Sequence, residues 1–153
     1  MAEQQKENKL RLRLVTPQQM LYEDDVDMVI MRTATGDLGA LYGHEALTTA
    51  LGYGIMRVMK DGVEYPFSVL GGFVEVNPHS ITILSDAAED PREIDKDRAV
   101  AAKERAERLL RDKMEGVDER RASLALRRAL VRIEASTYPL IGNTQNYQTT
   151  RKE

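Results

Sequence analysis

The sequence predicts an α+β protein in which an N-terminal antiparallel β-sandwich or barrel is followed by a C-terminal hairpin of two α-helices. Three observations predict this fold class. Short apolar stretches of strand type alternate with turn residues over 10–84. After Asp90-Pro91 the apolar period changes from that of strands to that of a helix. A glycine-containing break at 115–118 then divides the helical region in two.

The first strands are expected at 10–15 and 25–33. The stretch "LRLRLV" (10–15) alternates apolar and basic residues, which is the pattern of a half-buried strand. The stretch "DVDMVIMRT" (25–33) is a longer apolar run and predicts a second strand. Short strands of this kind, separated by frequent turns, are typical of sandwiches and barrels.

Two β-hairpins are expected next. Within 54–72, Asp61-Gly62 separates two runs of strand type, and this dipeptide favours a turn in which both central residues have φ > 0. Within 73–84, Asn77-Pro78 takes the same place. Each of the two segments is therefore predicted to fold as an antiparallel pair of strands.

The first helix is expected over 95–114, a stretch that contains neither glycine nor proline. Its apolar face consists of Ala99, Ala102, Ala106, Leu109 and Leu110. The second helix is expected from about Asp118, its N-cap, to Ser136. Its apolar face consists of Ala122, Leu126, Ala129, Leu130 and Ile133. Because alanines bury little apolar area, the hairpin is predicted to be marginally stable alone and to have more than one arrangement.

These elements divide the chain into a strand-rich domain over 9–90, the helical hairpin over 94–136, and a polar tail over 137–153 that is expected to be disordered. The N-terminal residues lack the apolar stretch of a signal peptide. No apolar run approaches the ~20 residues that a membrane-spanning helix needs. Any membrane association is therefore expected to come through partners.

The composition excludes several kinds of site. The 153-residue chain has no cysteine and two histidines, so it offers neither thiolate chemistry nor a multi-histidine metal site. It also lacks a phosphate-loop motif and a set of catalytic residues. Residues 1–93 carry 8 basic and 15 acidic residues, whereas 94–136 carry 12 basic and 9 acidic ones. An acidic first part joined to a basic hairpin indicates different surroundings for the two.

Three arginines of the hairpin are predicted to converge. If the chain turns midway between residues 116 and 117, Arg105 lies opposite Arg128, and Arg132 follows one helical turn later. Guanidinium groups gathered in this way attract phosphate or carboxylate groups. The alternative is that they are solvated charges paired with neighbouring glutamates. A nucleic-acid surface is disfavoured by the interspersed acidic residues and the acidic first part.

Four segments of the chain together resemble a known family. They are "GDLGALYGHEALTTALGYG" (36–54), "LGGFVEV" (70–76), "ITILSDAAE" (81–89) and the helical hairpin. In this order, and over about 9–136, they resemble the epsilon subunit of the bacterial F-type ATP synthase. The resemblance implies a β-sandwich of about ten strands over 9–90, followed by a regulatory two-helix hairpin.

The resemblance implies a non-catalytic rotor subunit of the central stalk, which couples catalysis to proton or ion translocation. Its implied partners are the gamma subunit and the c-ring, and also the alpha and beta subunits when the helices extend and inhibit ATP hydrolysis. The implied location is the cytoplasmic face of the bacterial cell membrane, as a peripheral part of the complex. Two rival interpretations stay open: a purely coupling epsilon subunit without nucleotide binding, and an unrelated β-sandwich adaptor with a coiled-coil arm.

The resemblance further implies that the folded hairpin binds ATP as a regulatory ligand, not as a substrate, and without a required metal. Some members of the family bind ATP through the pattern (Ile/Leu)-Asp-x-x-Arg-Ala, which residues 94–99 match in full. The implied ATP-binding residues are Glu89, Ile94, Asp95, Arg98, Ala99, Arg105, Arg128 and Arg132. They include the three arginines that the hairpin geometry brings together.

A second implied site is the contact with the rotor ring. Asp37 and His44 align with the loop that faces the ring in the family. This chain departs from the family there, because Tyr42 and Ala46 stand where prolines are common. Proline restricts the backbone, so the loop is expected to be less stiff than in other members.

Overall fold

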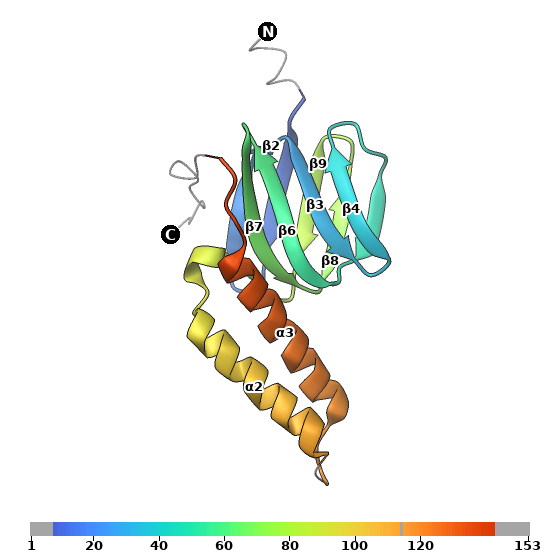
Figure 1. Cartoon of the computed structure of the whole chain (residues 1–153). Helices are drawn as coiled ribbons and strands as arrows, with labels where there is room; N and C mark the ends of the chain where they lie inside the picture. Colours follow the sequence, from blue (N-terminus) through green and yellow to red (C-terminus); the bar gives the residue numbers. More distant parts are fainter. Residues whose placement is uncertain (1–7, 114, 143–153) are drawn as a thin grey trace.

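A computed structural model describes residues 8–113 and 115–142 and confirms a β-sandwich followed by a two-helix hairpin (Figure 1). The strands are β1 (Leu10–Val15), β2 (Met20–Val26), β3 (Met28–Thr33), β4 (Gly36–Leu41), β5 (Leu47–Ala50), β6 (Tyr53–Lys60), β7 (Val63–Leu70), β8 (Phe73–Val76), β9 (Ser80–Leu84) and β10 (Ala88–Glu89). A short 3₁₀ helix, η1 (Pro91–Glu93), leads into α2 (Lys96–Asp112) and α3 (Glu119–Thr137). In Figure 1 the helices project from one end of the sandwich.

The strands form two five-stranded sheets. Sheet A has the order β2-β1-β9-β8-β5, and sheet B has the order β10-β7-β6-β3-β4. Neighbouring strands are antiparallel, apart from β1 and β9, which run parallel with Arg11 beside Ser80 and Val15 beside Leu84. Sheet A therefore joins the first strand of the domain directly to one of its last.

The core lies between the sheets, and β1 illustrates how the sequence builds it. Leu10, Leu12 and Leu14 are fully buried. Arg11 and Arg13, which alternate with them, point outward and donate hydrogen bonds to Glu23 on β2 at 2.8 and 3.4 Å. The predicted alternation of this strand is confirmed. Each buried leucine adds roughly 1.5–3 kcal/mol of hydrophobic stabilisation, so the strand is held mainly by its inward face.

The single strand predicted at 25–33 is wrong. Residues 25 and 26 end β2 in sheet A, whereas residues 28–33 form β3 in sheet B. Asp27 makes the crossing between the sheets. Its backbone N–H donates to the carbonyl of Met59 at 2.8 Å, and its carboxylate accepts the backbone N–H of Asp61 at 2.7 Å. Because apolar residues flank this point on both sides, the pattern looks continuous although the chain changes sheet.

Both predicted hairpin turns are confirmed. Asp61 and Gly62 have φ angles of 50° and 76° and connect β6 to β7, as a turn with two left-handed residues requires. Between β8 and β9, the N–H of Asn77 donates to the carbonyl of Ser80 at 2.8 Å. These tight connections fix the register of both strand pairs.

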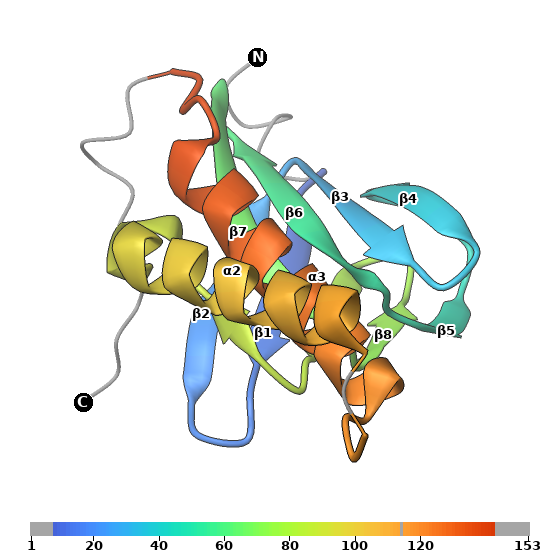
Figure 2. The same ribbon diagram turned by 60° about the horizontal axis from the view of Figure 1, so that its bottom comes forward.

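Each helix begins at an aspartate that caps it. The carboxylates of Asp95 and Asp118 accept the backbone N–H groups of Arg98 and Arg121 at 3.0 and 3.1 Å. The buried helical residues are Ala99, Ala106, Ala122, Ala129, Val131 and Ala135. α3 contacts β6, β7 and η1, while α2 packs on α3 (Figure 2). Among the described residues, no helix is both long and apolar enough to span a membrane.

The chain after α3 differs in part from the expected disordered tail. Residues 138–142 lie beside β7, where the backbone N–H of Glu64 donates to the carbonyl of Ile141 at 3.0 Å. The rest of the expected tail, 143–153, lies outside the described residues.

Candidate functional site

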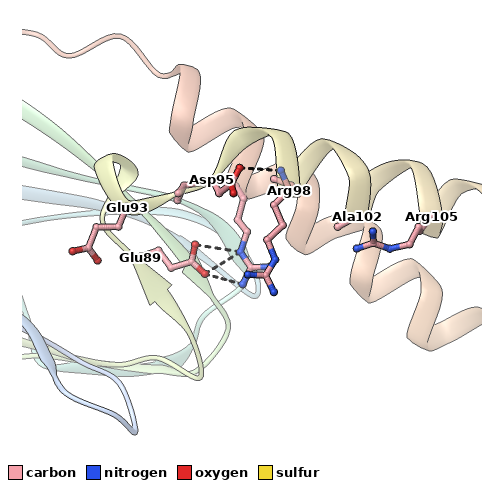
Figure 3. A pocket seen from close by; sticks show the side chains of 9 residues that line it. Glu89, Glu93, Asp95, Arg98, Ala102 and Arg105 are labelled. Atoms are coloured by element: carbon pink, nitrogen blue, oxygen red, sulfur yellow. Dashed lines mark hydrogen bonds and ion pairs between the residues drawn. The ribbon is translucent and has the colours of Figure 1, made fainter.

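A cavity of about 490 Å³ lies where the sandwich, the linker and both helices meet (Figure 3). It is lined by Glu89, Glu93, Ile94, Asp95, Arg98, Ala99, Ala102, Arg105 and Arg132. Seven of the eight residues that the family resemblance implies for the ATP site therefore lie around one cavity. Four separate elements contribute to it, namely β10, η1, α2 and α3.

One side of α2 forms one wall of the cavity. Arg98, Ala102 and Arg105 follow one another at spacings of four and three residues, which places them on the same helix face. The alanine between the two arginines leaves room above the helix. Neither guanidinium group makes a hydrogen bond or an ion pair with another residue of 8–113 or 115–142. Figure 3 shows the Arg105 side chain extending along α2 toward Arg98.

The opposite wall contains an ion pair between Arg132 on α3 and Glu89 on β10. The Nε atom of Arg132 donates to Oε1 of Glu89 at 2.9 Å, and a terminal nitrogen donates to the same oxygen at 2.7 Å. Both side chains are about one-third exposed, so the pair stabilises the docked helix by no more than about 1 kcal/mol. The wall is therefore weakly held and can exchange partners.

The cavity balances three carboxylates, on Glu89, Glu93 and Asp95, against three guanidinium groups. Glu89 pairs with Arg132, and the carboxylate of Asp95 caps α2. Within the described part of the chain, no group of three or more acidic or histidine side chains is arranged to hold a metal ion. The chemistry that the lining offers is the binding of an anion by guanidinium groups.

Asp90 anchors the linker between the sandwich and α2, and this residue is only 2% exposed. Its carboxylate accepts the hydroxyl of Tyr65 at 2.6 Å and a terminal nitrogen of Arg92 at 2.7 Å. It also accepts the backbone N–H of Arg92 at 2.9 Å, which caps η1. The guanidinium of Arg92 lies over the ring of Tyr65, 5.4 Å from its centroid. This cluster fixes the point from which the chain leaves the sandwich toward Ile94 and Asp95.

The electrostatics of the anchor favour its charged form. Burial alone raises the pKa of Asp90, but the hydrogen bonds from Arg92 and Tyr65 outweigh burial and leave this pKa below its usual value. Burial and the neighbouring carboxylate both raise the pKa of Tyr65. The hydrogen bond to Asp90 raises the pKa of Arg92. Asp90 is therefore an anion and Arg92 a cation over the whole neutral range.

Arg128, the eighth expected residue, does not line the cavity. Its guanidinium is 5.9 Å from the ring centroid of Tyr53 on β6, and a terminal nitrogen donates to the Tyr53 hydroxyl at 3.5 Å. The guanidinium of Arg127 lies 5.3 Å from the same centroid. The predicted patch of three arginines is thus not assembled, and two of the three line the cavity. The prediction considered only α2 as a neighbour of α3, whereas α3 also packs on β6 and β7.

Sequence reasoning missed several residues at this site. Glu93 and Ala102 line the cavity, and Asp90 with Tyr65 and Arg92 anchors it. A signal for Asp90 was present, because an aspartate followed by proline marks the start of a helical turn. Tyr65 gave no such signal, since it comes from β7 and reaches Asp90 only through the tertiary fold.

The two residues assigned to the ring contact lie at opposite ends of β4. Asp37 is in the strand and pairs with Arg32 at 2.7 Å across to β3. His44 is in the turn after the strand, where its Nδ1 lies 2.7 Å from the carbonyl of Glu45. The loop is tied down without the usual prolines, because Gly43 donates to the carbonyl of Pro78 at 2.7 Å.

Family comparisons match the whole of both domains. Residues 9–91 match the family described as ATP synthase, Delta/Epsilon chain, beta-sandwich domain. Residues 92–137 match the companion family, ATP synthase, Delta/Epsilon chain, long alpha-helix domain. The boundary between the two matches falls next to Asp90 and the start of η1.

Individual relatives agree with the family match. The chain is 44% identical to the ATP synthase epsilon chain of Bacillus velezensis, over 83% of this chain and 96% of the relative. It is 47% identical to the ATP synthase epsilon chain of Halalkalibacterium halodurans over the same shares. A chain in the cryo-EM structure of the Euglena gracilis mitochondrial ATP synthase, OSCP/F1/c-ring in rotational state 1, superposes with a TM-score of 0.67 at 28% identity. That superposition covers 80% of this chain and 78% of the other.

Proposed function

The chain belongs to the ATP synthase delta/epsilon chain family, and on this premise we propose that it is a regulatory and coupling subunit of the central stalk, without catalytic activity of its own. It joins the gamma subunit to the c-ring at the cytoplasmic face of the bacterial membrane and links catalysis to proton or ion translocation. The Euglena structure that contains the similar chain comprises F1 and a c-ring, which supports a place between F1 and the ring.

ATP is the regulatory ligand of the cavity in this proposal. The observation that supports this proposal is that seven of the expected residues line one cavity. Its volume of about 490 Å³ suits a small-molecule ligand. Arg98 and Arg105 supply guanidinium groups for the phosphates. Ile94 and Ala99 supply a small apolar wall for the base and the ribose. Arg132 can bind the phosphates when its ion pair with Glu89 breaks.

The position of the cavity explains how ATP would act as a signal. The lining comes from the sandwich and from both helices, so the complete site exists only when the hairpin is folded on the sandwich. ATP that binds this state alone shifts the population toward it by mass action. When ATP is scarce, the helices open into a rod of ~60 Å, estimated at 1.5 Å per residue for ~40 residues. The basic rod then meets the alpha and beta subunits and inhibits hydrolysis.

Titration of the isolated chain with ATP tests this function. Calorimetry should show saturable binding below millimolar ATP, and amide NMR should show shifts concentrated around Asp95, Arg98 and Arg105. ADP and inorganic phosphate serve as comparison ligands for the phosphate contribution. Absence of saturable binding up to millimolar ATP would leave the chain as a purely coupling subunit.

The ring contact is proposed along the β4–β5 edge, which we define as Asp37, Leu41, Tyr42, His44 and Leu47. β4 and β5 are edge strands of sheets B and A, so this side of the sandwich is open. The three apolar members of the edge are 54%, 40% and 39% exposed, respectively. Exposed apolar residues between Asp37 and His44 suit a protein contact.

Reversing the charge of Asp37 is expected to weaken this contact partially. In Asp37→Lys the acidic group is lost and a lysine faces Arg32 across the strand pair. Exposed ion pairs contribute about 0.2–1 kcal/mol each, so coupling between ATP hydrolysis and proton pumping should fall without being abolished. The measurement is proton pumping per ATP hydrolysed in reconstituted vesicles, with Asp37→Asn as the control for size. Unchanged coupling in Asp37→Lys at moderate salt would remove Asp37 from the contact.

A further inference from the structure

The residues after α3 form a short strand-like segment that lies beside β7, and in Figure 1 this segment runs up the side of the sandwich. We define Tyr138–Gly142 as the C-terminal segment. It lies beyond both family matches, which end at residues 91 and 137. Its backbone meets β7 through an isolated antiparallel bridge between Ile141 and Glu64. Neither domain assignment therefore accounts for it.

The bridge fills an open stretch of sheet edge. β10 pairs with β7 at Ser68 and Val69, so within residues 8–113 and 115–142 no other named strand covers the first half of β7 on this side. The backbone N–H of Glu64 donates into this gap, and the carbonyl of Ile141 accepts it at 3.0 Å. Unpaired strand edges readily bind an additional strand, and here the chain supplies one of its own.

Side chains reinforce the contact at Glu64. Its carboxylate accepts the hydroxyl of Tyr138 at 3.4 Å and a terminal nitrogen of Arg57 at 3.3 Å. The Glu64 side chain is 13% exposed, which shields these bonds from water. Tyr138 is also the residue that ends α3. The same glutamate thus holds the end of the helix and the segment that follows it.

Gly142 lies close to the connection between β6 and β7. It has φ of +91°, and a Cβ atom at this position would lie 2.7 Å from the carbonyl oxygen of Gly62 and 3.0 Å from Cα of Val63. Both are backbone atoms, in the β6–β7 turn and at the start of β7, and backbone cannot yield as a flexible side chain does. The segment therefore depends on a glycine at 142, for its conformation and for its space.

We propose that the C-terminal segment is a latch that holds the helical hairpin on the sandwich. The segment is covalently continuous with α3, so α3 cannot leave β6 and β7 until the bridge at Glu64 breaks. Its regulatory consequence rests on the proposed function: a larger folded fraction strengthens the apparent affinity for ATP, because only the folded fraction binds. The latch itself does not depend on ATP.

The rate of hydrogen exchange at the Glu64 amide measures whether the latch is closed. In the full-length chain the Glu64 amide should be protected, and in Gly142→Val and in a chain ending at Thr137 it should exchange at least tenfold faster. Ile141→Ala is the matched control, because it removes a half-exposed side chain but keeps the backbone carbonyl that accepts the bond. Equal protection of Glu64 in all four proteins would overturn the proposal.

A distance measurement tests whether the segment holds the hairpin. The chain has no cysteine, so Gln18→Cys on the sandwich and Glu104→Cys on α2 introduce the only two sites for thiol-reactive fluorescent labels. The open population should increase in Gly142→Val and in the truncated chain, but not in Ile141→Ala. Faster exchange at Glu64 with an unchanged distance distribution would also overturn the latch. Failure of ATP binding in the wild type, with both latch readouts as expected, would instead reject only the nucleotide function.

Discussion

Replacing Arg105 by alanine is expected to weaken ATP binding by roughly ten- to a hundredfold. A hydrogen bond to a charged group contributes about 1.5–3 kcal/mol, and each 1.4 kcal/mol corresponds to a factor of ten in the dissociation constant. Arg105 lines the cavity and has no hydrogen-bonding or ion-pair partner among the described residues. Its removal should therefore leave the free energy of unfolding nearly unchanged. Calorimetric titration with ATP and urea unfolding measure the two quantities.

Arg108→Ala is the matched control for this prediction. Arg108 lies on the same helix but does not line the cavity of the proposed ATP site; it lines a second hollow, to which Arg105 also contributes. Removing it deletes the same charge, so a general electrostatic effect on ATP would appear equally in both variants. Equal loss of affinity in Arg105→Ala and Arg108→Ala would contradict a specific phosphate contact at Arg105.

Arg128 provides a second comparison. The family resemblance assigns it to ATP, but its guanidinium lies over Tyr53. We expect Arg128→Ala to weaken ATP binding much less than Arg105→Ala, through looser docking of α3 alone. A loss as large as that of Arg105→Ala would show that the guanidinium leaves Tyr53 and reaches the phosphates.

Replacing Asp90 by alanine is expected to lower the free energy of unfolding by about 2–4 kcal/mol, since it leaves the buried Tyr65 hydroxyl without its acceptor and removes the cap of η1. Tyr65→Phe, which removes the hydroxyl alone, should cost less. Asp86→Ala is the control, because Asp86 is an exposed aspartate in the same region. Urea unfolding at neutral pH measures all three. A loss in Asp90→Ala no larger than that in Asp86→Ala would contradict the anchor.

The effect of Asp90→Ala should depend on pH in a defined direction. The pKa of Asp90 is lowered in the folded protein, so its stabilising contribution is complete above the unfolded-state pKa of about 3.9. That contribution is lost as the pH falls through the lower, folded-state pKa. The difference in stability between the wild type and Asp90→Ala should therefore be constant from pH 5 to pH 8 and narrow below about pH 4. A difference that grows on acidification would contradict the assigned charge.

The local features of this fold were predictable from sequence because short-range physics determines them. The alternation in 10–15, the Asp61-Gly62 turn and the Asp118 cap each depend on a few adjacent residues, and the structure contains all of them. The break at Asp27 was not predictable in this way. It depends on Met59 and Asp61, which approach only after the two sheets have packed.

The same distinction applies to the cavity. Arg98 and Arg105, which the resemblance assigns to one site, lie on one face of α2 and line the same cavity. Arg128 was misplaced because the face that it occupies is decided by α3 docking on β6, and no pattern within the helix reports this. The expected set therefore departs from the cavity lining at Arg128, whose position depends on how α3 docks on the sandwich.

The parallel pairing of β1 with β9 has a consequence for synthesis on the ribosome. Leu14 lies beside Ile83, and these two residues enter the same core from distant parts of the sequence. Pairings between distant residues form slowly, because a long loop must close first. Sheet A can therefore be completed only after Leu84, the last residue of β9, has left the exit tunnel. Until then β1 and β2 form a hairpin whose apolar face is uncovered. The two helices contact each other locally, but α3 can dock on β6 and β7 only once these strands are in place.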